Sequence, residues 1–103
     1  MYKLEFLPIA KKDIDDIIYY ISNTLKNTTA AINLAKCFIE SANNILNFPY
    51  SFSEYITTSN LENSYRSIKV KNFLMFYTIN ENDKIITIVR VLYQKMDINS
   101  ILN

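Results

Sequence analysis

The hydrophobic residues of this chain change their spacing half-way along, and this change limits the folds it can adopt. From Pro8 to Leu25 the apolar residues recur every three or four positions, which is the period of a helix. A second run with the same period begins after the N-cap cluster at Asn27 and closes at Pro49. From Tyr65 onward the apolar runs are short and rich in β-branched and aromatic residues, as is typical of strands.

Four strands and two helices follow from these periods. The predicted strands are 2–6, 65–70, 73–79 and 85–93. The order is β-α-α-β-β-β, which predicts a single α+β domain over residues 1–103, with an antiparallel sheet and a two-helix hairpin packed on one face. The polar stretch 49–64 has no clear period and is expected to be an irregular loop, of a length that is more often functional than accidental.

The lack of glycine, of histidine and of a second cysteine excludes many kinds of site. The chain has no glycine and no histidine, and Cys37 is its only cysteine. A Gly-rich phosphate loop, an internal disulfide, a structural zinc site and a histidine general base are therefore excluded, and we expect neither a metal nor a cofactor. Without glycine, left-handed turns are expected to fall on Asn or Asp. The net charge of +1 gives no sign of a generic nucleic-acid binder.

The location of the protein is predicted from its apolar runs. None of these runs is long enough to cross a bilayer, and the first residues lack the basic and apolar segments of a signal peptide. We therefore expect a cytoplasmic protein with no membrane partner.

The two arginines both fall inside predicted strands. Arg90 has apolar neighbours on both sides, as expected for an inner strand. An unpaired buried guanidinium is costly, so Arg90 is expected to form a salt bridge, with Asp97 or Glu5 as partner, or to recognise an anion or a partner protein. The same alternatives apply to Arg66, near the start of its strand.

Lysines and tyrosines in the second half of the chain combine charge with aromatic rings. They are Lys69, Lys71, Lys95, Tyr65 and Tyr93. Such a cluster is similar to a surface that binds RNA. Alternating lysines are equally expected on a solvated strand face or on a guarded sheet edge.

One polar stripe of the first predicted helix is also a candidate for partner contact. Lys12, Asp16, Tyr19 and Asn23 share the face turned away from the core. A tyrosine among charges suits an interface, although it is also an ordinary exposed residue.

Several stretches, taken together and in this order, resemble the RelE/ParE toxin superfamily. They are Phe6-x-Pro8-x-Ala10-x-x-Asp13-Ile14, Ala30-Ala31, Phe48-Pro49, the run from Tyr65 to Tyr77, the run from Ile88 to Asp97, and Ile101-Leu102. The resemblance covers almost the whole chain and implies the β-α-α-β-β-β fold. It also implies the toxin of a bacterial type II toxin–antitoxin pair, neutralised by a cognate antitoxin.

The resemblance implies one of two activities. ParE-like members poison DNA gyrase, whereas RelE-like members cut mRNA in the ribosomal A site. For the second activity it implies a basic residue opening the third strand, where this chain has Leu74, and basic residues or a histidine near the end of the last strand, where it has Leu92 and Gln94. Without histidine, a tyrosine or lysine would need a pKa shifted by several units. The run from Arg90 to Asp97 looks closer to ParE-like members.

We therefore expect a ParE-like toxin that inhibits DNA gyrase by protein–protein contact. The residues expected to bind partners are Arg66, Arg90, Tyr93, Lys95, Asp97 and Tyr19. The alternative, a ribosome-dependent mRNA endoribonuclease, would use Arg66, Lys69, Lys71, Arg90 and Tyr93. A third interpretation is an inactive binding module, and a homodimer stays open. An apolar patch larger than a monomer needs is expected near the helical hairpin and the sheet edge.

Overall fold

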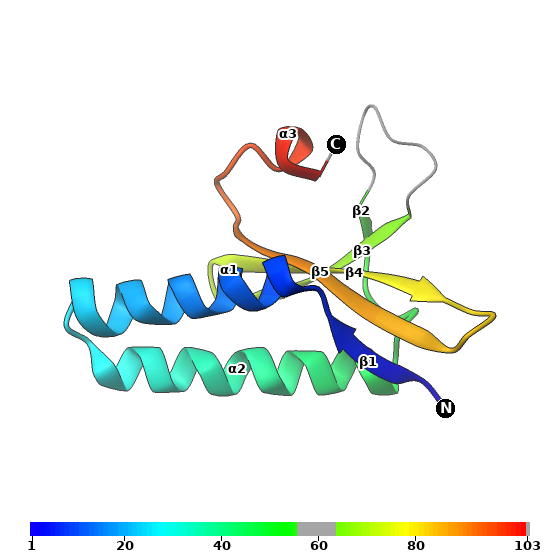
Figure 1. Ribbon diagram of the computed structural model, residues 1–103, viewed down its shortest axis with the longest axis horizontal. Coiled ribbons are helices and arrows are strands. Elements are labelled where there is room, and N and C mark those ends of the chain that lie inside the picture. The colour runs from blue at the N-terminus through cyan, green and yellow to red at the C-terminus, as the bar shows by residue number, and fades with distance from the viewer. Residues whose placement is uncertain (56–63, 103) are drawn as a thin grey trace.

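The computed structural model describes residues 1–55 and 64–102 and shows an α+β fold (Figure 1). Its strands are β1 (Lys3–Phe6), β2 (Glu54–Tyr55), β3 (Tyr65–Val70), β4 (Phe73–Asn80) and β5 (Ile85–Tyr93). Its helices are α1 (Pro8–Tyr19), the π-helical turn η1 (Tyr20–Thr24), α2 (Thr28–Asn47) and α3 (Ile98–Leu102). The predicted fold class, with a helical hairpin packed on a mostly antiparallel sheet, is confirmed.

The two long helices begin and end where the sequence predicts. Pro8 opens α1, where its missing N–H costs nothing, and η1 continues the same helix to Thr24. The side chain of Asn27 accepts a hydrogen bond from the Ala30 N–H at 3.1 Å and caps α2. This helix ends at Asn47, two residues before Pro49. The pair extends beyond the sheet at its far end (Figure 1).

The sheet is mixed, in the order β1-β5-β4-β3-β2. Strands β3, β4 and β5 form the predicted antiparallel meander, but β1 pairs with β5 in parallel, from Lys3 opposite Ile85 to Phe6 opposite Ile88. The prediction of an antiparallel sheet is therefore wrong for β1. A long connection through helices permits parallel pairing, and no short turn joins β1 to β5 to fix its direction.

Two short elements depart from the sequence predictions. The predicted irregular loop contains β2, which pairs with β3 through Glu54 opposite Arg66. The part of this prediction that covers 56–63 lies outside the described residues. Helix α3 was not predicted, and a five-residue helix is too short to show a helical period.

A β-bulge interrupts the pairing of β4 with β5. Tyr77 lies opposite Ile88 and Phe76 lies opposite Arg90, so Val89 is an extra residue without a partner. After the bulge Val91 joins the same core cluster as Ile88, beneath the helical hairpin.

Both faces of the sheet carry an apolar core. The core under α1 and α2 has fully or nearly fully buried side chains at Leu34, Phe38, Ile45, Met75, Tyr77, Ile86 and Ile88. A smaller core on the opposite face is formed by Phe76, Leu92, Ile98 and Leu102. Helix α3 supplies the last two of these side chains and so covers the second face of the sheet (Figure 1).

Three lysines, and no Asn or Asp, take up positive φ in the described part of the chain. Lys26, Lys71 and Lys84 have φ values of 53°, 56° and 56°. The prediction that Asn or Asp would occupy such positions is wrong, although each lysine has an Asn or Asp as its neighbour. At the first turn the reason is clear, because Asn27 is occupied in capping α2 with φ at −120°.

Replacing Lys71 with asparagine should stabilise the fold. Asparagine tolerates the left-handed region better than lysine, so we expect the free energy of unfolding to rise by about 0.5–1 kcal/mol. Urea unfolding followed by circular dichroism measures it. Lys69→Asn, at an exposed position near the end of β3 and with an ordinary φ, is the matched control and should bring no gain. An equal gain in both variants would contradict the assignment of strain to the turn.

Candidate functional site

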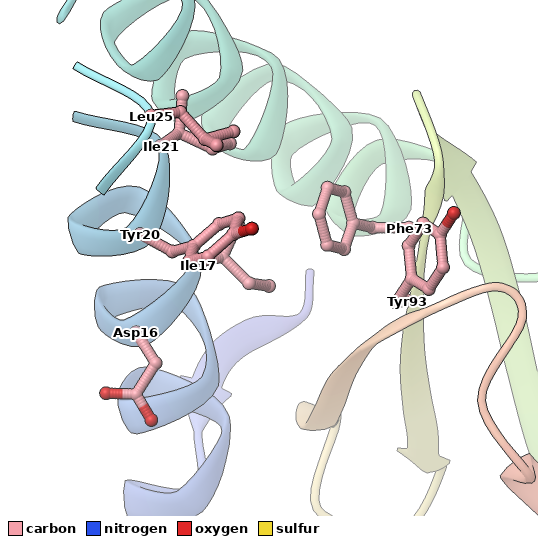
Figure 2. A pocket seen from close by; sticks show the side chains of 7 residues that line it. All are labelled: Asp16, Ile17, Tyr20, Ile21, Leu25, Phe73 and Tyr93. Carbon is pink, nitrogen blue, oxygen red and sulfur yellow. The ribbon is translucent and has the colours of Figure 1, made fainter. Parts of the chain in front are cut away.

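An open apolar groove lies between the helical hairpin and one end of the sheet (Figure 2). The helical side of this groove, here called the helix–sheet groove, is formed by Asp16, Ile17, Tyr20, Ile21 and Leu25. Phe73, at the start of β4, and Tyr93, at the end of β5, form the other wall. Its volume is about 590 Å³, which is in the range of ligand-binding clefts.

The π-helical turn shapes the helical wall of the groove. Tyr20 and Ile21 belong to η1, and Leu25 follows it directly. Such wide turns are uncommon and often mark functional sites. Tyr20 and Leu25 are 53% and 56% exposed, which leaves large apolar side chains uncovered beside the groove.

A smaller hollow of about 180 Å³ adjoins the groove. The two share Asp16, Ile17, Phe73 and Tyr93, so they form one continuous depression. The smaller one, here called the side hollow, is further lined by Asp13, Arg90, Val91, Leu92 and Met96.

An ion pair between Asp13 and Arg90 lies at the side hollow. The guanidinium donates from Nε to Asp13 Oδ2 at 2.8 Å and from Nη2 to Oδ1 at 2.9 Å. Asp13 Oδ2 also accepts the Val91 N–H at 3.0 Å. The hydrogen bonds from Arg90 to Asp13 raise the pKa of Arg90. The predicted partners, Asp97 and Glu5, are wrong, because α1 places the carboxylate of Asp13 beside β5.

This ion pair also closes part of the free edge of β5. Strand β1 pairs with β5 only as far as Ile88, so among the described residues no strand lies beyond the last part of β5. The carboxylate of Asp13 takes the Val91 N–H that a neighbouring strand would otherwise accept. A charge placed at an edge in this way discourages unwanted strand pairing.

The residues predicted to bind partners separate into two regions. Tyr93 and Arg90 line the side hollow, and Lys95 is exposed directly after β5. Asp97 accepts a hydrogen bond from Ser100 Oγ at 2.7 Å, at the start of α3. Tyr19 is 65% exposed but does not line the groove, whereas its neighbour Tyr20 does.

Arg66 lies away from the groove and holds the segment after α2. Its Nη1 donates to the Phe52 carbonyl at 2.7 Å, and its Nη2 donates to Glu54 at 3.2 Å. The guanidinium also lies over the ring of Tyr50, 5.1 Å from its centre. These contacts give Arg66 a structural role in attaching this segment to β3. Lys69 and Lys71 are exposed on β3 and its turn.

A polar cluster forms around Glu81 at the opposite end of β4 and β5. The carboxylate accepts hydrogen bonds from Lys84, Tyr50 and Tyr2, the last at 2.8 Å. These bonds lower the pKa of Glu81 to about 2, and the bond to the carboxylate raises the pKa of Tyr50 to about 12. The cluster joins the first residues of the chain to the segment after α2.

Replacing Glu81 with glutamine should change how stability depends on pH. The folded pKa of about 2 lies below the ordinary value of 4.5, so Glu81 stabilises the fold above pH 4.5 and loses this effect as the pH falls towards 2. We expect Glu81→Gln to be less stable at neutral pH and to lose less stability on acidification. Urea unfolding at a series of pH values between 2 and 7 measures the two slopes. Equal slopes would contradict the prediction.

Within residues 1–55 and 64–102, no group of three or more Cys, Asp and Glu side chains is placed to hold a metal ion. No helix in this part of the chain is long and apolar enough to span a bilayer.

Comparison with known structures supports the fold. A chain of the chromosomal ParDE system from P. aeruginosa aligns with a TM-score of 0.71 at 17% identity, over 90% of this chain and 96% of that one. A chain of the archaeal RelE–RelB complex from Pyrococcus horikoshii OT3 gives 0.58 at 13% identity, over 91% and 96%. The isolated E. coli RelE toxin gives 0.56 at 15% identity, over 99% and 95%. At these identities the likeness shows a shared fold.

Comparison of sequences gives the family. No curated protein sequence matches the chain. The profile of the family described as "ParE toxin of type II toxin-antitoxin system, parDE" matches residues 4–98. The resemblance to the RelE/ParE superfamily is confirmed, and the chain belongs to the ParE toxin family of type II toxin–antitoxin systems.

Proposed function

We propose that this ParE-family toxin is neutralised by a cognate ParD antitoxin that binds in the helix–sheet groove, and that it inhibits DNA gyrase by protein–protein contact. The observation that carries the proposal is the groove itself. It has a volume of about 590 Å³ and mostly apolar walls, and large apolar side chains are exposed beside it, as is typical of surfaces that bind another protein.

A segment that folds on binding suits such a groove. Disordered segments can bury apolar side chains in a partner's groove as they become ordered, either as an amphipathic helix or as an added strand. At the neighbouring edge of β5, Asp13 already accepts a hydrogen bond from the Val91 N–H. A strand added at this edge would therefore first have to displace the partly buried ion pair of Asp13 and Arg90. This favours a helix as the bound form of the antitoxin.

The arrangement of the basic residues favours contact over catalysis. Cleavage of RNA needs a proton acceptor, a proton donor and a cation within reach of one phosphate. Arg90 is paired with Asp13, and Arg66 is engaged by Glu54 and by the Phe52 carbonyl. The residues of the endoribonuclease alternative therefore do not converge on one free site among the described residues.

Two assays with the purified protein test the target. We expect inhibition of supercoiling by DNA gyrase and no cleavage of mRNA in a translation reaction. Transcripts cut by the wild-type protein but left intact by Arg90→Ala would reverse the assignment in favour of the endoribonuclease. Unimpaired growth of a bacterial host that expresses the protein without its antitoxin would favour the inactive binding module.

Replacing Ile17 with glutamate should weaken binding of the antitoxin. Ile17 lines both the groove and the side hollow, and a carboxylate there would have to be desolvated when the antitoxin binds. We expect a roughly thirtyfold increase in the dissociation constant, measured by calorimetry. Ile32→Glu, at an exposed position of α2 outside the groove, is the matched control and should bind normally. Equal binding by both variants would place the antitoxin elsewhere.

A further inference from the structure

Three of the seven residues that line the helix–sheet groove carry aromatic rings. Tyr20 stands on the helical wall, and Phe73 and Tyr93 stand on the sheet wall (Figure 2). The rings of Phe73 and Tyr93 pack edge to face, with 5.9 Å between their centres. The face of an aromatic ring is negative and attracts cations, most strongly when the cation is partly removed from water.

Asp16 adds a carboxylate to the same walls and is free to exchange its partner. It lines both the groove and the side hollow. Its carboxylate pairs with Lys12, one turn earlier on α1, at 2.7 Å. The side chains of this pair are 65% and 73% exposed, and such pairs contribute little to stability. An incoming cation could therefore replace Lys12 at small cost.

The second carboxylate of the depression is not available in this way. Asp13 already accepts two hydrogen bonds from Arg90 and one from the Val91 N–H, and its side chain is only 13% exposed. The ion pair leaves no net charge at this position. The charge that remains to be matched along the groove is the negative charge of Asp16.

From these observations we propose that the groove takes a lysine or arginine side chain of the antitoxin, paired with Asp16 and lying against the rings of Tyr20 and Tyr93. This rests on the proposed function, in which the antitoxin occupies the groove. Aliphatic side chains on either side of the basic residue would contact Ile17, Ile21 and Leu25. Asp16 thereby selects between antitoxins by charge, while the apolar walls supply most of the contact area.

The test compares full-length toxin variants for binding to the full-length ParD antitoxin by calorimetry. We expect Asp16→Asn to raise the dissociation constant at least tenfold and to reduce its dependence on salt. Asp15→Asn removes an exposed carboxylate next to Asp16 that lines neither hollow and should bind within twofold of wild type. Equal effects of the two variants would overturn the proposal.

Lys12→Met separates two roles for Asp16. If Asp16 binds the antitoxin directly, removing its internal partner leaves binding unchanged or makes it tighter. If Lys12 is the contacting group and Asp16 only positions it, Lys12→Met weakens binding as much as Asp16→Asn, which would overturn the proposal.

A double-mutant cycle identifies the basic residue. Each lysine and arginine of the antitoxin is replaced by methionine and measured against wild-type toxin and against Asp16→Asn. One of these residues should lose its effect in the Asp16→Asn background, and the absence of any coupling would overturn the proposal. If the antitoxin fails to bind wild-type toxin, the proposed function fails. If it binds normally to Asp16→Asn, only the charge pairing fails.

Discussion

Replacing Asp13 with alanine should lower the free energy of unfolding by about 3 kcal/mol, because the change leaves two groups without partners. The guanidinium of Arg90, 23% exposed, loses both of its hydrogen bonds, and the Val91 N–H loses its acceptor. This is a large share of the 5–15 kcal/mol typical of a small domain. Urea unfolding measures it.

Two variants separate the ion pair from general effects on α1. Asp15→Ala removes an exposed carboxylate two residues away and should change stability by less than about 0.5 kcal/mol. Adding Arg90→Met to Asp13→Ala should recover part of the loss, because the uncompensated charge is gone. A double variant as unstable as the sum of the two single variants would show that the two residues act independently.

Replacing Phe76 with alanine should lower the free energy of unfolding by about 4 kcal/mol. Phe76 has no exposed surface and packs edge to face with Tyr55, with 5.1 Å between the ring centres. It forms the middle of the core beneath α3, where Ile98 and Leu102 close over it. Deleting the ring leaves a cavity that a five-residue helix can fill only in part.

Phe48→Ala is the matched control for this change. Phe48 follows α2 and is 61% exposed, so the same truncation there removes little buried surface. We expect a loss below about 0.5 kcal/mol. A small loss at Phe76 as well would mean that the face of the sheet under α3 is not a packed core.

The elements that the sequence predicts well are those with long hydrophobic periods. Both long helices and the three strands of the meander have enough residues to show their spacing. The elements it misses are short, such as β2 and α3, or depend on distant pairing, such as the parallel contact of β1 with β5. Tertiary contacts decide these, and local spacing does not contain them.

The candidate site could be predicted only in part. The sequence predicts Tyr93 and Arg90 as site residues, because one is aromatic and the other is charged and both lie in the last strand. The helical wall is missed, because Ile17, Ile21 and Leu25 belong to a stripe that predicts a buried core. In the structure the hairpin extends beyond the sheet, so the end of this stripe is left uncovered (Figure 1). The partner of Arg90 is also missed, since only packing of α1 against β5 brings Asp13 close.

The bulge in β5 decides which face of the sheet each side chain at the end of this strand points to. Side chains alternate between the two faces of a sheet, so one added position reverses the order for every residue after it. If β5 kept Val89 but had no bulge, strict alternation from Ile88 would turn Tyr93 towards α3 and take one wall of the groove with it. In an alignment of related toxins, a chain with a one-residue gap at this point would therefore need no bulge to keep this wall of the groove, whereas a chain of equal length that pairs its last two strands without a bulge would lose it.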